Sequence, residues 1–193
     1  MIALILGLVL FLGVHSVRLF AADWRVAQIE RRGLLMWKGL YALVSLVGLV
    51  LIIWGYGQAR LTPEWLWVSP VWTRHLAALL TIPAFILIAA TYVPGTLIKA
   101  RVGHPMLLGV KFWALAHLIA NGTLADVLLF GGFLVWAVML YIVSRRRDRL
   151  AGIHYPAAGA SRDAIAVVVG LVAYVIFALW LHGPLIGVRP FGG

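Results

Sequence analysis

The sequence has no cysteine and few charged side chains. Without thiols it cannot form disulfides, bind zinc or an iron–sulfur cluster through thiolates, or attach a c-type haem covalently. Only 11% of the residues are charged, against about 25% in soluble domains. In contrast, 64% are hydrophobic and the mean hydropathy is +1.03. These values exclude an ordinary soluble enzyme and a disordered chain, and they predict a protein that crosses a membrane several times.

Apolar runs divide the chain into segments about as long as membrane-spanning helices. A chain of 193 residues accommodates about six helices of ~20 residues with short loops. We therefore predict an all-α, polytopic bundle of six transmembrane helices, in which residues 1–193 form a single domain. Stop signals are expected at the arginine run 145–147 after the fifth span and at Gly183-Pro184 after the sixth. The six predicted spans cover residues 1–20, 34–57, 71–92, 104–122, 123–143 and 163–182.

The positions of the basic residues predict the orientation in the membrane. Cytoplasmic loops carry an excess of Lys and Arg, and thirteen of the sixteen basic residues flank the odd-numbered connections. We expect these connections to be cytoplasmic and both termini to lie on the non-cytoplasmic side. The net charge of +10 is then a topology signal, and we expect membrane lipids rather than nucleic acid as the partner. The basic run 145–149 is expected to contact anionic lipid. The thirteen residues are Arg18, Arg25, Arg31, Arg32, Lys38, Lys99, Arg101, Lys111, Arg145, Arg146, Arg147, Arg149 and Arg162; Arg60, Arg74 and Arg189 lie on the other side.

Six histidines are the main candidates for chemistry in this apolar chain. Polar groups inside lipid are costly, so they are functional candidates. The sequence has no Ser-His-Asp pattern, phosphate loop, His-Glu-x-x-His motif or glycine-rich nucleotide turn. Asp126 and Asp163 are predicted at helix starts, where the helix dipole accounts for them. Imidazole groups inside helices remain, and axial ligation of haem is one of their known uses.

His15 and His117 lie inside predicted spans. For each, a ligand role competes with a packing or hydrogen-bonding role in the helix bundle. Arg18, about one turn beyond His15, either extends to the membrane surface or pairs with an acidic cofactor group such as a propionate.

The other four histidines are expected at interfaces or in a loop. His104 precedes Pro105 at the start of the fourth span, where proline suits the first helical position. His75 and His182 are expected at the outer interface, and His154 in a cytoplasmic loop as a solvated side chain.

Three motifs resemble those of a known family. The segment 104–122, HPMLLGVKFWALAHLIANG, resembles the signature of the NnrU family, as do His15-Ser16-x-Arg18 and His182-Gly183. The resemblance covers nearly the whole chain. It implies a multi-pass protein of the bacterial cytoplasmic (inner) membrane that is associated with denitrification, with respiratory or nitrogen-oxide reductase components as possible partners.

The NnrU family is also related to 15-cis-zeta-carotene isomerase, a membrane enzyme with a b-type haem. By motif, the resemblance implies that His15 and His117 are the axial ligands of haem b, with Arg18 also contributing to cofactor binding. Lys111 and Asn121 depart from the isomerase pattern, which puts the substrate in doubt. If the chain is an enzyme, the resemblance implies haem-dependent cis–trans isomerisation of an apolar polyene; otherwise it serves nitrogen-oxide respiration or is a cofactor-free accessory protein.

A depth estimate tests this ligand pair. His15 lies about 20 Å from the outer end of its predicted helix and His117 about 20 Å from the inner end of its own. In a core of about 30 Å the two would differ in depth by roughly 10 Å. Helix tilt and the imidazole arms can bridge this difference. If they do not, His117 pairs instead with His182 or His75, which share the outer half.

Overall fold

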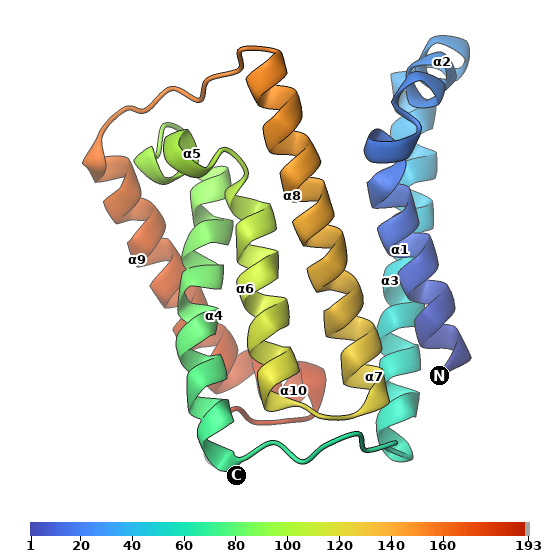
Figure 1. Ribbon diagram of the computed structural model, residues 1–193, viewed down its shortest axis with the longest axis vertical. Helices are drawn as coiled ribbons and strands as arrows, with labels where there is room; N and C mark the ends of the chain where they lie inside the picture. Colours follow the sequence, from blue (N-terminus) through green and yellow to red (C-terminus); the bar gives the residue numbers. More distant parts are fainter. Residues whose placement is uncertain (192–193) are drawn as a thin grey trace. The chain divides into compact units, whose positions relative to one another are not determined.

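The computed structural model describes residues 1–191, which fold into helices joined by loops (Figure 1). An isolated β-bridge joins Trp65 and Thr123. The helices group into two compact units, and each is described separately below.

Unit 1 comprises Met1–Trp67 and Gly122–Trp136. Its helices are α1 (Ile2–Phe20), α2 (Ala22–Arg32), α3 (Leu34–Leu61), α7 (Leu124–Asp126), the π-helical turn η1 (Val127–Gly131) and the first residues of α8 (Gly132–Leu150). Unit 2 comprises Val68–Asn121 and the described residues from Ala137 onward. It contains α4 (Val71–Tyr92), α5 (Leu97–Val102), α6 (Pro105–Ala120), the remainder of α8, α9 (Ala160–Ile176), the π-helical turn η2 (Phe177–Leu181) and α10 (His182–Ile186).

Helices α1 and α3 of unit 1 pack backbone against backbone. A methyl group added at Gly7 would lie 2.6 Å from the amide nitrogen of Ile52, and one at Gly48 would lie 2.8 Å from that of Phe11. Gly55 is similarly pressed against Leu4. This register is antiparallel. Small residues are typical of helix contacts in membranes, where close packing replaces the hydrophobic effect as the force between helices.

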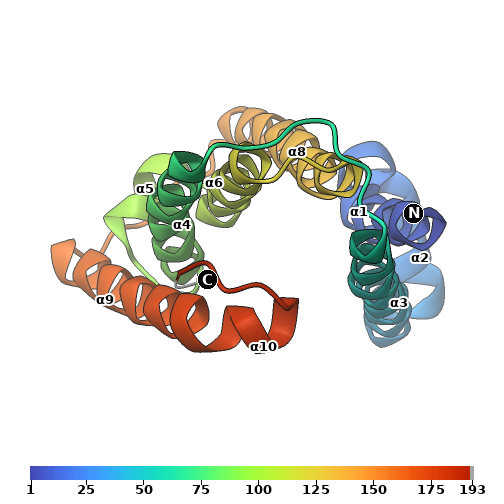
Figure 2. The same cartoon turned by 90° about the horizontal axis from the view of Figure 1, so that it is seen from below.

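Helix α4 is flanked by α6 and α9 in unit 2, as the end-on view in Figure 2 shows. Glycines again permit the contact. A methyl group added at Gly109 of α6 would lie 2.9 Å from the carbonyl oxygen of Ala84. One added at Gly170 of α9 would lie 2.6 Å from Cα of Ile86. The hydroxyl of Tyr174 on α9 also donates a hydrogen bond to the carbonyl of Ala78 (3.1 Å). The middle of α4 is therefore held by two glycine contacts at one level.

Five of the predicted spans are confirmed as helices long and apolar enough to cross a bilayer. They are Ile2–Phe20, Leu34–Leu61, Val71–Tyr92, Leu124–Leu150 and Ala160–Ile186. The sixth, α6, is apolar but has 16 residues, about 24 Å at 1.5 Å per residue, against a hydrocarbon core of about 30 Å. The six-span count therefore stays a prediction.

Two predicted helix ends are wrong. The helix of the fifth span does not stop at arginines 145–147 but continues to Leu150, because Arg is a good helix former and its long side chain reaches out from the helix. The last helical stretch begins at Ala160 and passes through Gly183-Pro184 to Ile186, so this dipeptide does not end it.

The short helices α2 and α5 lie between predicted spans.

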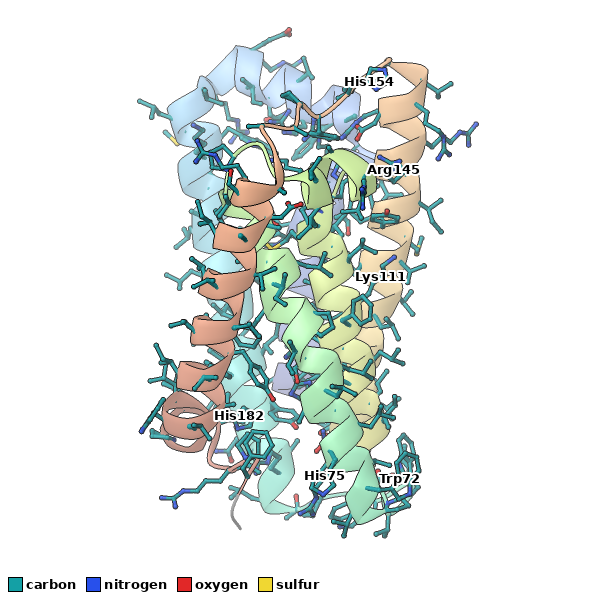
Figure 3. The ribbon with its side chains drawn as sticks, turned by 90° about the vertical axis from the view of Figure 1, so that its left-hand side faces the viewer. Trp72, His75, Lys111, Arg145, His154 and His182 are labelled. Atoms are coloured by element: carbon teal, nitrogen blue, oxygen red, sulfur yellow. The ribbon has the colours of Figure 1, made fainter. Side chains whose placement is uncertain are left out.

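The two ends of unit 2 differ in their side chains. Figure 3 shows Trp72, His75 and His182 near one end of the unit, and Arg145 and His154 near the other. His75 and His182 are the outer pair of the sequence analysis, and Arg145 and His154 belong to its cytoplasmic set, so the two sets lie at opposite ends of the unit. Which end faces the cytoplasm stays a prediction.

We predict that Gly7→Ala destabilises the protein by about 1–3 kcal/mol, because the added methyl meets the backbone of α3. Gly13→Ala, on the same helix with nothing within 4 Å of the added carbon, is the matched control and should be neutral or stabilising. Thermal unfolding of both variants in detergent measures the difference. Equal unfolding temperatures would show that α1 and α3 do not need this close approach.

The absence of cysteine makes the predicted orientation directly testable. Two single-cysteine variants place a thiol in loops that are predicted on opposite sides, Ser69→Cys outside and Ala157→Cys in the cytoplasm. In intact bacterial cells an impermeant maleimide should label only the first, and after lysis it should label both. Labelling of Ala157→Cys in intact cells would contradict the predicted orientation.

Candidate functional site

His15 lies in the last third of α1, and its ring orientation is fixed by a backbone carbonyl. Its Nδ1 is 2.7 Å from the carbonyl oxygen of Phe11, one turn earlier. A carbonyl oxygen only accepts, so Nδ1 carries the hydrogen and, in a neutral ring, the lone pair lies on Nε2. Histidines that bind metals usually show this arrangement, with the other ring nitrogen donating to a carbonyl or carboxylate.

Aromatic side chains of unit 1 surround the His15 ring. The ring centroid of Phe11 lies 4.3 Å away, that of Tyr41 on α3 5.3 Å away and that of Trp136 on α8 6.2 Å away. Tyr41 and Trp136 present their rings edge-on. The imidazole is therefore held in a largely apolar, aromatic environment.

Two buried polar atoms near His15 make no hydrogen bond. Among the described residues, Ser45 Oγ and Trp136 Nε1 are the buried side-chain atoms that lack a partner. Phe11 packs at the level of Gly48, so in this antiparallel pair Ser45 lies at the level of His15. Buried polar groups without partners are rare in native structures and need an explanation. Both atoms are suited to a polar group of a bound molecule.

The other members of the His15-Ser16-x-Arg18 motif differ in their surroundings. Ser16 is buried, and its hydroxyl donates to the carbonyl of Leu12 (2.6 Å). Arg18 is exposed in the last turn of α1. Ser16 therefore serves the helix itself, whereas Arg18 lies at a position from which it can reach polar surroundings.

His117 on α6 repeats the geometry of His15, in unit 2. Its Nδ1 donates to the carbonyl of Trp113 at 2.8 Å, which again places the lone pair of a neutral ring on Nε2. The Trp113 ring lies 5.3 Å from the imidazole. Asn121 donates to the carbonyl of His117 (2.8 Å) and ends the helix. The flanking Ala114 and Ala116 are fully buried, so they serve close helix packing.

Of the remaining histidines, His182 shares the ligand-like tautomer. Its Nδ1 donates to the carbonyl of Val188 (2.6 Å), and its ring contacts Phe177 edge-on. His75 lies in the first turns of α4, near the same end of unit 2 (Figure 3). His154 is exposed in the loop after α8, as predicted. No group of three or more His, Cys, Asp or Glu residues within residues 1–191 is placed to hold a metal ion.

The sequence analysis missed a polar cluster around Asp148. This carboxylate is 2% exposed, and its Oδ2 accepts from His104 Nε2 (2.7 Å) and from the hydroxyl of Tyr155 (2.8 Å). Arg147 lies 3.4 Å from the other oxygen. Burial and the hydrogen bond to the Asp148 carboxylate raise the pKa of Tyr155. One sequence signal could have indicated this cluster: Asp148 is a single acidic residue inside a run of arginines. A carboxylate that is buried needs charged or hydrogen-bonding partners of this kind.

Asp126 and Asp163 lie at helix starts, as predicted. Asp126 is buried and forms a capping box with Thr123, while the hydroxyl of Tyr56 donates to its other oxygen (2.6 Å). Asp163 is in the first turn of α9 and accepts from the amide of Ile98 (3.1 Å). Tyr56 is the partner that the sequence did not reveal, since it lies 70 residues away along the chain.

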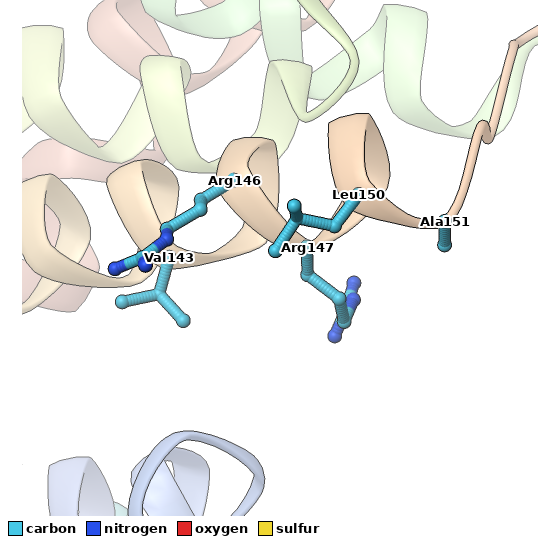
Figure 4. Close-up of a pocket in the computed structure, with 5 residues that line it drawn as sticks. All are labelled: Val143, Arg146, Arg147, Leu150 and Ala151. Atoms are coloured by element: carbon cyan, nitrogen blue, oxygen red, sulfur yellow. The ribbon is translucent and has the colours of Figure 1, made fainter.

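Two arginines line an open hollow along the last turns of α8, shown in Figure 4. The hollow measures about 410 Å³. Its lining residues all come from α8 and the residue that follows it, and the residues other than the arginines are aliphatic: Val143, Arg146, Arg147, Leu150 and Ala151. The predicted contact of this run with anionic lipid stays a prediction.

We predict that His104→Ala destabilises the protein by about 1–3 kcal/mol, because the buried Asp148 loses one of its donors. His154→Ala is the matched control and should be neutral, since His154 is exposed. Thermal unfolding in detergent measures both. Wild-type stability of His104→Ala would mean that Tyr155 and Arg147 satisfy the carboxylate on their own.

The comparisons with known proteins give one match. The family model described as "NnrU protein" matches residues 3–190, nearly the whole chain. No curated protein and no solved structure matches. The motifs around His15, His117 and His182 and this match agree, and the chain belongs to the NnrU family.

Proposed function

We propose that this protein binds b-type haem, with Nε2 of His15 and of His117 as iron ligands, and that it serves nitrogen-oxide respiration in the bacterial inner membrane. The observation that carries the proposal is the shared hydrogen bond from Nδ1 to a carbonyl one turn earlier. It gives both rings the tautomer and the fixed orientation that iron ligation requires.

The surroundings of His15 support the fit of a haem. The aromatic rings of Phe11, Tyr41 and Trp136 suit an apolar macrocycle. Ser45 Oγ and Trp136 Nε1 are buried donors without a partner, and the propionates of haem are acceptors. Arg18, exposed one turn beyond His15, has the charge to pair with a propionate. A non-haem metal cluster is less well supported, because no three ligand-type side chains gather within the described residues.

Each part of this site has a chemical role. A haem held by His15 and His117 would supply one-electron redox chemistry. The Phe11 and Trp113 carbonyls hold the imidazoles in one tautomer and raise their basicity. The aromatic residues around His15 would limit the access of water to a bound haem and so influence its redox potential.

The biological process rests on the family. Denitrification, the inner-membrane location and a respiratory or nitrogen-oxide reductase partner are part of this proposal; NnrU membership and the five apolar helices support it. A haem-dependent polyene isomerase would use the same histidines. The cellular experiment below distinguishes this activity from a role in nitrogen-oxide respiration.

Absorption spectra of the detergent-purified protein, oxidised and reduced, test the proposal together with a pyridine haemochrome assay. We expect a b-type spectrum with about one haem per chain. His15→Gly and His117→Gly should each lose most of the haem or change its spectrum, and added imidazole should restore it in part. His154→Gly is the control and should match the wild type. A colourless protein after haem-supplemented expression, or unchanged spectra in both variants, would overturn the proposal.

A cellular arm separates the two uses of the same haem. Deletion of the gene in its host should impair growth on nitrite or nitrate as the electron acceptor and leave polyene isomers unchanged. Complementation of a carotenoid-isomerase-deficient strain by this chain would favour the isomerase instead.

A further inference from the structure

A small cavity lies at the end of unit 2 that carries the cluster around Asp148. It measures about 210 Å³. Its walls come from the end of α4, from α5, from the start of α6 and from the loop after α8. The lining residues are Thr91, Lys99, Gly103, His104, Pro105, Met106, Leu107 and Tyr155.

The lining is basic, although a carboxylate lies close behind it. Lys99 and His104 are the ionisable lining residues besides Tyr155, and none of the eight is acidic. Asp148 does not line the cavity; it is buried, and its Oδ2 receives the His104 and Tyr155 hydrogen bonds. These two hydrogen bonds hold the His104 and Tyr155 rings in place at the cavity.

Two cations add positive charge here: Lys99 in the lining and Arg145 next to the lining residue Gly103. Lys99 Nζ lies 5.8 Å from the centre of the Tyr155 ring, and no carboxylate within residues 1–191 forms an ion pair with it. The guanidinium of Arg145 packs against Gly103, since a methyl added there would lie 2.5 Å from an Arg145 nitrogen. Figure 3 shows Arg145 near the same end of the unit as His154. The region is therefore positive, and the Lys99 ammonium forms no ion pair among the described residues.

We propose that this cavity binds the phosphate group of an anionic phospholipid, with Lys99 and His104 as the binding residues. Pockets for drug-sized ligands measure about 300–1,000 Å³. The smaller volume of this cavity suits one phosphate group of a lipid headgroup. A lysine ammonium is a common phosphate binder. Pro105, Met106 and Leu107 add an apolar wall that fits the lipid part of such a ligand.

The location favours a lipid over a free ion. The cavity lies among the residues of the predicted cytoplasmic interface, where anionic lipids attract basic side chains. Inorganic phosphate carries the same anionic group as the lipid, so the experiment measures its binding in a separate arm. The site is separate from the histidines proposed to bind haem, so either proposal can fail without the other.

The test compares Lys99→Gln with Lys111→Gln in the full-length, detergent-purified protein. Both variants lose one ammonium in unit 2, but Lys111 lies on α6 with its ammonium 4.0 Å from the Tyr141 ring centre and does not line the cavity. Native mass spectrometry measures titration with phosphatidylglycerol, with phosphatidylcholine as the neutral reference. Calorimetry with sodium phosphate forms the second arm, and circular dichroism checks the fold of each variant.

We expect phosphatidylglycerol to bind the wild type and Lys111→Gln alike, and Lys99→Gln about tenfold more weakly. His104→Gln should show a similar loss. Inorganic phosphate binding that depends on Lys99, without lipid binding, would keep the anion site and replace the lipid as its ligand. Equal binding by Lys99→Gln and Lys111→Gln in both arms, or no binding by the wild type, would overturn the proposal.

Discussion

Inside a bilayer the hydrophobic effect does not draw helices together, because lipid tails are as apolar as the side chains. The helices of this protein must therefore gain their contacts from close approach. Gly7, Gly48 and Gly55 bring α1 and α3 into backbone contact, and Gly109 and Gly170 do the same on two sides of α4. Large side chains elsewhere on these helices remain exposed, where lipid can cover them. The architecture of each unit depends on these few positions where a side chain is missing.

Close packing of apolar helices leaves few partners for a polar side chain, and the backbone supplies most of them. His15, Ser16, His117 and Thr81 all donate to a carbonyl one turn earlier. For a hydroxyl this bond only satisfies the donor. For an imidazole it also fixes which nitrogen keeps its lone pair, so one local bond prepares the ring for ligation. The proposal of a haem protein rests on this difference.

The buried carboxylates follow a different rule, because an acceptor cannot be satisfied by carbonyls. Asp126 and Asp148 each collect donors from several segments: Tyr56 and Thr123 for the first, His104, Tyr155 and Arg147 for the second. Tyr56 lies 70 residues from Asp126 and His104 lies 44 residues from Asp148, so these two bonds connect segments that are distant in the sequence. Asp148 does so beside a basic cavity, and in this way a structural group shapes the proposed phosphate site.

The sequence alone determined the membrane class, the family and the start of most helices. Composition and hydropathy are sums over many residues, so single errors do not change them, and helix α4 was predicted with both of its ends. The motif residues were sufficient to indicate the family, which the family model confirms. The helix ends at Leu150 and Ile186 were not predictable from local stop signals, since arginine and Gly183-Pro184 are tolerated where the rest of the helix stabilises them. Only the tertiary structure decided the environment of His15, because Tyr41 and Trp136 are distant in sequence. The same holds for the bond between His104 and Asp148, since a hydrogen bond between side chains 44 residues apart leaves no periodic pattern in the sequence.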